Sequence, residues 1–173
     1  SANHEVYLVT SQHSNEDVLI YKLNENLDKF EEVQRISATT KFDIMLSLNV
    51  NSSTFLILTQ SGDRKLFIYR LHSDTQRFVF QQILDEMNEE IINVIALHIN
   101  SEPFIVVSKK SGILCFYQWR GRENWQIRHC GQFENLKHMK SFQHLNEQRI
   151  FLASGVALNA DNSISALIIH RQG

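Results

Sequence analysis

Short apolar runs recur along this chain at a nearly constant spacing, and polar segments separate them. The clearest marker is a tyrosine framed by apolar residues, which appears at Tyr21, Tyr69 and Tyr117 and repeats about every 48 residues. Four kinds of run share this period: residues 7–10, 55–58, 104–107 and 151–154; residues 20–23, 68–71, 116–119 and 168–171; residues 30–34, 78–82 and 125–128; and residues 43–46, 93–97 and 139–142. A common period over four kinds of run indicates an internal repeat.

Each run has the length and composition of a β-strand, because it is short and rich in Val, Ile, Phe and Tyr. Segments rich in Gly, Asn, Asp and Ser lie between the runs and predict turns. Four short strands in each repeat are typical of a β-propeller, so we predict an all-β fold built from blades of four antiparallel strands. A β-sandwich is the alternative, but its strands would each show one polar face and no fixed period. Residues 85–97 have some helical spacing, which the equivalent stretches lack, so at most a short helical turn is expected at residues 85–89.

The repeat predicts one partial propeller over residues 1–173. Residues 5–24 supply half a blade, and residues 30–72, 78–120 and 125–172 supply three full blades. A closed propeller needs about four to eight blades, so about three and a half blades imply a larger ring. Self-association of two such chains is the alternative route to closure. In either case we expect an open arc with one exposed apolar flank.

Composition narrows the class of partner. Hydrophobic residues make up 43% of the 173 residues and charged residues 21%, which is globular and excludes wholesale disorder. The net charge of −2 argues against a phosphate-binding surface, so no nucleic-acid partner is expected. No apolar run approaches the ~20 residues of a membrane span, and no targeting signal is visible at the N-terminus.

The sequence contains no motif for catalysis, for a cofactor or for a metal. Its eight histidines are scattered, and the best metal candidates, His138 and His144, only flank one predicted strand at a spacing that matches no ligand pattern. A nucleophile elbow and a phosphate-binding glycine loop are absent. The paired acids Glu31 and Glu32 point to opposite faces of a strand. We therefore predict that the protein is not an enzyme and has no catalytic, cofactor-binding or metal-binding residues.

Two features are candidates for covalent modification. Cys115 and Cys130 lie symmetrically about the predicted turn at residues 122–123, so their Cα atoms should lie within about 7 Å. They are either two buried thiols or a disulfide of an oxidising compartment. Asn51 begins the chain's Asn-x-Ser sequon in a predicted turn, and it is a candidate glycosylation site if the protein is secreted.

Two charged segments are candidate contact surfaces, and one tyrosine is a candidate core residue. Residues 85–90 are the densest acidic stretch, either a solvated loop or a patch that faces a partner, and residues 120–122 form a basic turn. Tyr69 has the periodicity of an inter-blade core position, so we expect it to be mostly buried between two sheets.

The order of the runs resembles the epilepsy-associated repeat, also called EAR or EPTP. Its pattern is Phe-x-x-x-Gln, then an aromatic followed by Leu/Ile-Val-Val, then Ile-Tyr-x-Trp/Leu, and residues 78–83, 102–108 and 115–119 match it best. The likeness covers about residues 5–172 and is weaker at both ends. The chain departs from the pattern where Ser108-Lys109 replaces the family's Ala-Asn, and the family's Gly-Ala-x-x-Trp-Glu segment has no counterpart, so the chain resembles a distant member.

This resemblance implies a secreted or cell-surface propeller of seven blades that binds other proteins and is not an enzyme. The leading hypothesis is therefore an extracellular protein–protein interaction module, which presents a rigid face to a receptor, matrix or cell-surface protein. An intracellular WD-type scaffold is the first alternative, although no Trp-Asp or Gly-His signature occurs. A propeller hydrolase is the second alternative, although no ionisable cluster recurs at the strand ends.

Overall fold

The computed structural model describes residues 5–11, 16–84, 88–99, 101–120, 124–132, 136–144, 147–159 and 162–170, and from residue 136 onward it describes the backbone alone. The described residues form fourteen β-strands and no helix, which confirms the predicted all-β class. The strands are β1 (Tyr7–Ser11), β2 (Val18–Asn24), β3 (Lys29–Ile36), β4 (Ile44–Val50), β5 (Ser53–Thr59), β6 (Leu66–His72), β7 (Arg77–Leu84), β8 (Ile91–Ile99), β9 (Glu102–Lys109), β10 (Ile113–Arg120), β11 (Asn124–Gln132), β12 (Leu136–His144), β13 (Glu147–Asn159) and β14 (Asn162–His170). No helical segment in this part of the chain could span a bilayer.

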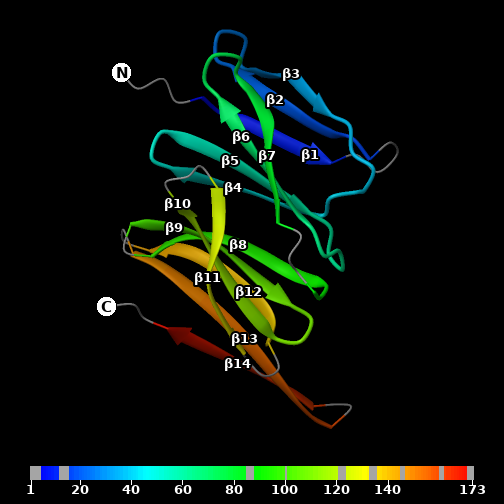
Figure 1. Ribbon diagram of the computed structural model, residues 1–173, viewed down its shortest axis with the longest axis vertical. Coiled ribbons are helices and arrows are strands. Elements are labelled where there is room, and N and C mark those ends of the chain that lie inside the picture. The colour runs from blue at the N-terminus through cyan, green and yellow to red at the C-terminus, as the bar shows by residue number, and fades with distance from the viewer. Residues whose placement is uncertain are drawn as a thin grey trace.

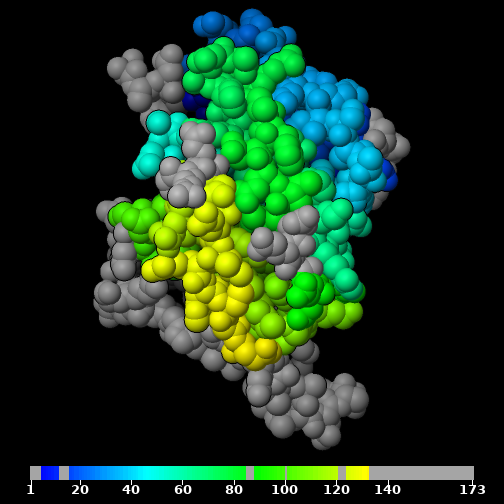
Figure 2. Space-filling view, viewed as in Figure 1, coloured from blue at the N-terminus to red at the C-terminus, as the bar shows by residue number. Residues whose placement is uncertain are grey.

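The strands form four antiparallel sheets in which chain neighbours pair. The first sheet has the order β1-β2-β3, the second β4-β5-β6-β7, the third β8-β9-β10-β11 and the fourth β12-β13-β14. The sheets are stacked one after another along the long axis of the molecule, with the first and fourth at opposite ends (Figure 1). Their outer strands β7 and β11 lie side by side on one face (Figure 2).

The sheets are not divided where the sequence repeat is divided. We predicted full four-stranded units at residues 30–72, 78–120 and 125–172, but β3, β7 and β11 each hydrogen-bond to the strand before them and close the preceding sheet. The physical reason is that only a few residues separate each of these strands from the one before it, and a short connection favours antiparallel pairing. Each predicted unit therefore straddles two sheets, and the half unit at residues 5–24 becomes part of a three-stranded sheet.

The tyrosine repeat coincides with a recurring irregularity of the backbone. The register shifts between Ile20 and Tyr21 in the first sheet, between Ile68 and Tyr69 in the second, and between Phe116 and Tyr117 in the third. In each case the outer strand carries one extra residue, which is a β-bulge. The tyrosine that recurs in the sequence thus marks the position of a β-bulge in each of three sheets.

Apolar side chains pack between the faces of adjacent sheets. The core between the first and second sheets includes Val18, Ile20, Leu56 and Phe78. The core between the second and third sheets is larger and includes a ring cluster in which Phe55 contacts Trp119 and Trp125. A third cluster, around Leu97, Val106 and Leu114, lies on the opposite face of the third sheet. Because both faces of the middle sheets are covered, their central strands are almost wholly apolar.

The outward face of the first sheet is apolar and exposed. Phe30 is 44% exposed, whereas its counterparts in the next two sheets, Phe78 and Trp125, are only 5% and 1% exposed. Val6 and Leu8 are also exposed beside Phe30. Alternation along the strands places Val6, Leu8, Tyr21, Leu23 and Phe30 on this face, which we call the outward face. Three exposed apolar side chains, Val6, Leu8 and Phe30, therefore lie on the outward face of the first sheet.

Candidate functional site

A groove of about 470 Å³ lies between the first and second sheets, and we treat it as the candidate site. Tyr7 and Val9 of β1 form one wall, while Ser47 and Asn49 of β4 and Leu56 of β5 contribute to the other. Most of the lining side chains are polar.

A polar cluster closes one end of the groove. The Tyr7 hydroxyl lies 2.9 Å from Gln76 Oε1 and 3.1 Å from Glu5 Oε2. Lys22 Nζ donates to Glu5 Oε1 at 2.6 Å and to Gln76 Oε1 at 2.9 Å. These four side chains, from the first sheet and from the turn between β6 and β7, connect the two sheets.

The cluster shifts the titration of two of its members. The hydrogen bond from Lys22 lowers the pKa of Glu5, so its carboxylate stays ionised below its ordinary range. Burial, followed by the hydrogen bond to Glu5, raises the pKa of Tyr7 to about 12. At neutral pH the Glu5 carboxyl is therefore ionised and the Tyr7 phenol is neutral.

Local backbone geometry places Gln76 in this cluster. Its φ of 55° is left-handed, and its backbone N–H donates to the His72 carbonyl at 2.9 Å. Its side-chain amide donates to the Ser73 carbonyl, which turns the amide oxygen toward Tyr7 and Lys22. The sequence analysis missed this residue, because a glutamine in a turn carries no motif.

Two glutamines tie the first sheet to the second and the second sheet to the third. The Gln34 amide donates to the Phe78 carbonyl at 2.7 Å, and its oxygen accepts the Phe78 N–H at 2.8 Å. Gln82 repeats both bonds with Trp125, at 3.1 and 2.9 Å. We call Gln34 and Gln82 the clasp glutamines. Their signal was the repeated Phe-x-x-x-Gln spacing, although the sequence did not show that these side chains cross to the next sheet.

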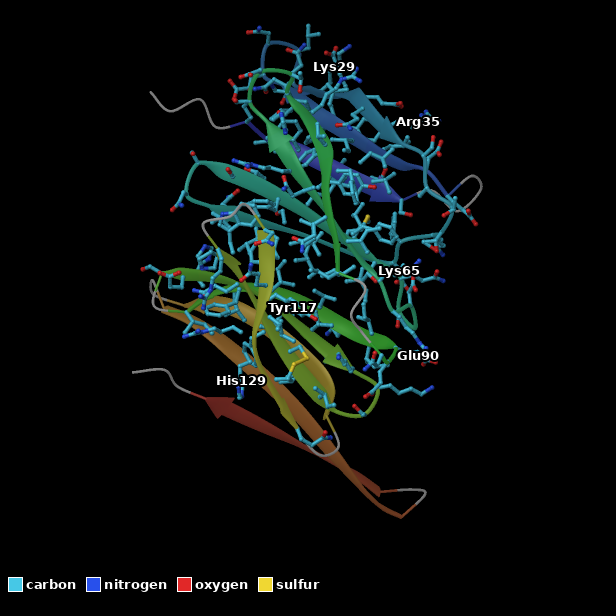
Figure 3. The ribbon with its side chains drawn as sticks, viewed as in Figure 1. Lys29, Arg35, Lys65, Glu90, Tyr117 and His129 are labelled. Carbon is cyan, nitrogen blue, oxygen red and sulfur yellow. A yellow bond between two sulfur atoms is a disulfide. The ribbon has the colours of Figure 1, made fainter. Side chains whose placement is uncertain are left out.

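His129 occupies the clasp position of the third sheet. It pairs with Phe116 as Gln34 pairs with Ile20 and Gln82 with Ile68. Its ring lies 6.4 Å from that of Phe116, on the side of the fourth sheet (Figure 3). Histidine thus stands in the third sheet where the first two sheets have glutamine.

The two cysteines are directly opposite each other on β10 and β11, and a disulfide joins them. Their Cα atoms are 4.2 Å apart, which confirms the hairpin register expected from the sequence. Cys115 is buried in the core between the second and third sheets, and Cys130 is exposed. The crosslink thus fixes the outer strand of the third sheet to its neighbour.

Asn51 lies where a modification would be accessible. It is exposed in the two-residue turn between β4 and β5, with a left-handed φ of 54° that asparagine tolerates well. The next residue, Ser52, lines the groove. A glycan on Asn51 would therefore stand at the rim of the groove.

The described part of the acidic stretch is partly neutralised. Glu90 pairs with Lys110 at 2.9 Å, and Glu89 accepts the Ser111 N–H at 3.1 Å. These contacts lower the pKa of both carboxyls. The residues lie at the margin of the second and third sheets beside Arg64, where Figure 3 shows Glu90. Residues 85–87 and 121–122 lie outside the described residues, and Arg120 is exposed.

Tyr69 is mostly buried between the first and second sheets, as expected, although it is not completely covered. It packs against the core of the first and second sheets and against the Phe80 ring, and this burial raises its pKa. Tyr117, its counterpart one sheet later, is 2% exposed and lies between two four-stranded sheets (Figure 3). Tyr69 faces the first sheet, which has only three described strands and covers it less.

Within the described residues, no group of three or more His, Cys, Asp or Glu side chains could hold a metal ion. His98 Nε2 lies 3.0 Å from the Asn49 carbonyl, which gives this histidine a structural contact between sheets. The two candidate histidines, His138 and His144, fall on β12, and their side chains lie outside the described part of the chain.

Known proteins resemble this chain in structure, but none of them shows its family. No family model matches the chain, and neither does any curated protein. A protein from Lactobacillus plantarum has a similar crystal structure, with a TM-score of 0.59 and 9% identity over 96% of this chain and 53% of that one. BBS1N in complex with ARL6DN gives a TM-score of 0.55 and 11% identity over 86% of this chain and 47% of that one. The chain spans about half the length of these two structures.

Proposed function

We propose that the chain is part of a larger, EAR-type β-propeller that acts as a non-enzymatic protein–protein interaction module. The observation that carries this proposal is the outward face, because a contiguous exposed apolar surface on a rigid scaffold marks a site of protein contact. The face is the counterpart of the face by which the second sheet packs on the first. It therefore suits a further sheet of the same repeat, which would extend the stack toward a ring of seven blades.

Two further findings support the proposal. The chain covers about half of each structural neighbour, as a segment of a ring would. Each clasp glutamine binds the backbone N–H and carbonyl of an aromatic residue in the following sheet. Phe30 is the equivalent aromatic residue of the first sheet, so it offers the same two groups to a glutamine of a preceding sheet. BBS1N is in complex with another protein in its structure, although at 11% identity that likeness concerns the fold alone.

An extracellular location is part of the proposal and is supported by the disulfide. Disulfides persist in oxidising compartments and are rare in the reducing cytosol, which disfavours the intracellular scaffold. The exposed sequon at Asn51 is compatible with passage through the secretory pathway. Peptide-N-glycosidase treatment of the protein from its natural source tests this location. A mobility shift that Asn51→Gln abolishes is expected, and a protein with free thiols and no glycan would contradict the proposed location.

Sedimentation velocity tests the binding role of the outward face. The isolated chain should self-associate through this face, and the double variant Leu8→Ser, Phe30→Ser should shift it to monomer. Ile127→Ser is the matched control, because Ile127 is 50% exposed but lies on the third sheet. A wild-type chain that stays monomeric at every concentration would contradict the proposal.

A further inference from the structure

The outer strands of the second and third sheets carry four exposed apolar side chains. Val79, Phe80 and Ile83 lie on β7 and Ile127 lies on β11, with exposures between 36% and 52%. The two strands, drawn in green and yellow, occupy adjoining parts of one face of the molecule (Figure 2). We call these four side chains the outer patch.

The outer patch belongs to sheets that already have their neighbours. The second sheet has four strands, and it packs against the first sheet on one face and the third on the other. Phe80 lies opposite Tyr69, at the outer margin of the core between the first and second sheets. Ile127 lies opposite Tyr117, at the outer margin of the core between the second and third sheets. A further sheet of the repeat would therefore leave the outer patch exposed.

The fold does not require apolar side chains at these positions. In β3 the three positions that correspond to the β7 members of the outer patch are all charged: Glu31, Glu32 and Arg35. Arg35 pairs there with Glu32 at 3.2 Å, and Glu31 pairs with Lys29 at 3.1 Å. Charged side chains of this kind keep an exposed edge strand from associating. β7 lacks that protection, which indicates a surface that another molecule covers.

The same strands carry arginines without ion-pair partners. Arg77 begins β7, Arg120 ends β10 and Arg128 is the extra residue of the bulge in β11, and all three are exposed. Within the described residues none of them forms an ion pair. β7, β10 and β11 contain no Asp or Glu, although the whole chain has a net charge of −2. These strands therefore concentrate positive charge beside the outer patch.

The main chain of β7 is poorly suited to pairing with an added strand. The clasp glutamine Gln34 takes both main-chain groups of Phe78, and the bulge at Gln81 interrupts the edge further along. Covered main-chain groups and bulges both hinder pairing between strand edges. The outer patch is therefore suited to recognition through side chains.

We propose that the outer patch and its arginines bind an acidic amphipathic segment of a partner protein. Apolar side chains of the segment pack on Phe80 and Ile127, while its carboxylates pair with Arg77 and Arg128. Aromatic residues and arginine are enriched in protein interfaces. The inference rests on the proposed function, because it gives the interaction module a binding face and states the chemistry of its partner.

The test is fluorescence anisotropy of the 173-residue chain with a labelled peptide of four Glu-Glu-Leu-Leu repeats. Saturable binding is expected. The triple variant Val79→Glu, Phe80→Glu, Ile83→Arg gives β7 the side chains of β3 and should weaken binding about tenfold or more. Leu27→Glu is the matched control, because Leu27 is 56% exposed in the turn between β2 and β3 and should leave the affinity unchanged.

A second variant guards against misfolding of the triple variant. Arg77→Gln with Arg128→Gln alters only exposed side chains, and it should also weaken binding and make it less sensitive to salt. An affinity that neither the triple variant nor this double variant changes would overturn the inference.

Two further peptides test the chemistry of the partner. Peptides of Glu-Glu-Ser-Ser and of Lys-Lys-Leu-Leu repeats should both bind about tenfold more weakly or worse, because one lacks the apolar side chains and the other the carboxylates. If the serine peptide binds as tightly as the leucine peptide, the surface recognises charge alone, as a sulfated polysaccharide offers it, and the inference is wrong. Equal binding of the lysine peptide would likewise contradict it.

This inference and the proposed function are separable in the same samples. The variant Leu8→Ser, Phe30→Ser should prevent self-association and leave peptide binding unchanged. If the peptide fails to bind while the wild-type chain still associates through the outward face, only this inference fails. If the wild-type chain neither binds the peptide nor self-associates, the proposed function fails as well.

Discussion

Gln82 shows how one side chain holds two sheets together. Its amide satisfies both main-chain groups of Trp125, which is 1% exposed. Gln82→Ala would leave these groups without their partner, and an unsatisfied buried group costs about 1–3 kcal/mol. We expect urea denaturation to show a loss of that size. Gln126→Ala is the control, because Gln126 is exposed and bonds only its own strand neighbour Asn124, so a change within about 0.5 kcal/mol is expected.

Tyr7 should make the free energy of unfolding fall as the pH rises above 10.0. Its pKa rises from 10.0 to about 12 in the folded state, so the folded protein keeps a proton that the unfolded chain loses. The contribution of this group is fully present below pH 10.0 and is lost as the pH rises to about 12. Tyr7→Phe should reduce the slope of unfolding free energy against pH in this window. An unchanged slope would show that the phenol is not held by the cluster.

At the scale of elements, the disulfide hairpin is the strongest local constraint. Cys115 and Cys130 are 15 residues apart, and a crosslink over a loop of this length contributes about 3 kcal/mol by restricting the unfolded chain. Reduction with dithiothreitol should lower the free energy of unfolding by about this amount. The double variant Cys115→Ser, Cys130→Ser should show the lower stability without reductant and no further response to it. If reductant leaves the wild-type chain unchanged, the cysteines are not crosslinked in solution.

The bulges and the clasp glutamines belong to the same outer strands. Gln34 and Gln82 each lie just beyond the extra residue of the bulge, opposite Ile20 and Ile68. Without the extra residue, these side chains would point to the opposite face of the sheet, because side chains alternate along a strand. The bulge therefore decides which neighbouring sheet the glutamine reaches.

At the scale of the whole molecule, equivalent residues differ because their sheets have different neighbours. Phe78 lies in the core between two sheets and contacts the Tyr7 ring, whereas Phe30 lies on the outward face. Phe78→Ala should cost about 3–5 kcal/mol, as is usual for buried aromatics. Phe30→Ala should cost clearly less in the isolated chain. Chemical denaturation of both variants checks this order, and equal losses would mean that the outward face is covered in solution.

Much of the fold could be predicted from the sequence, because strands and turns depend on local patterns. The fourteen apolar runs correspond to the fourteen strands, and the Cys115–Cys130 register follows from the near symmetry of a hairpin about its turn. The Asn51 turn was likewise visible in the sequence. Each of these features depends on residues that are close in the chain.

The tertiary structure alone decided which residues meet across sheets. The partners of Gln34 and Gln82 are more than 40 residues away, at sequence separations of 44 and 43, and Gln76 meets Tyr7 across a separation of 69. The difference in burial between Tyr69 and Tyr117 has the same origin, since it depends on the sheet that faces each residue. The period of the sequence fixes where strands occur, but the burial of a side chain and the shape of a groove depend on the sheet that faces it.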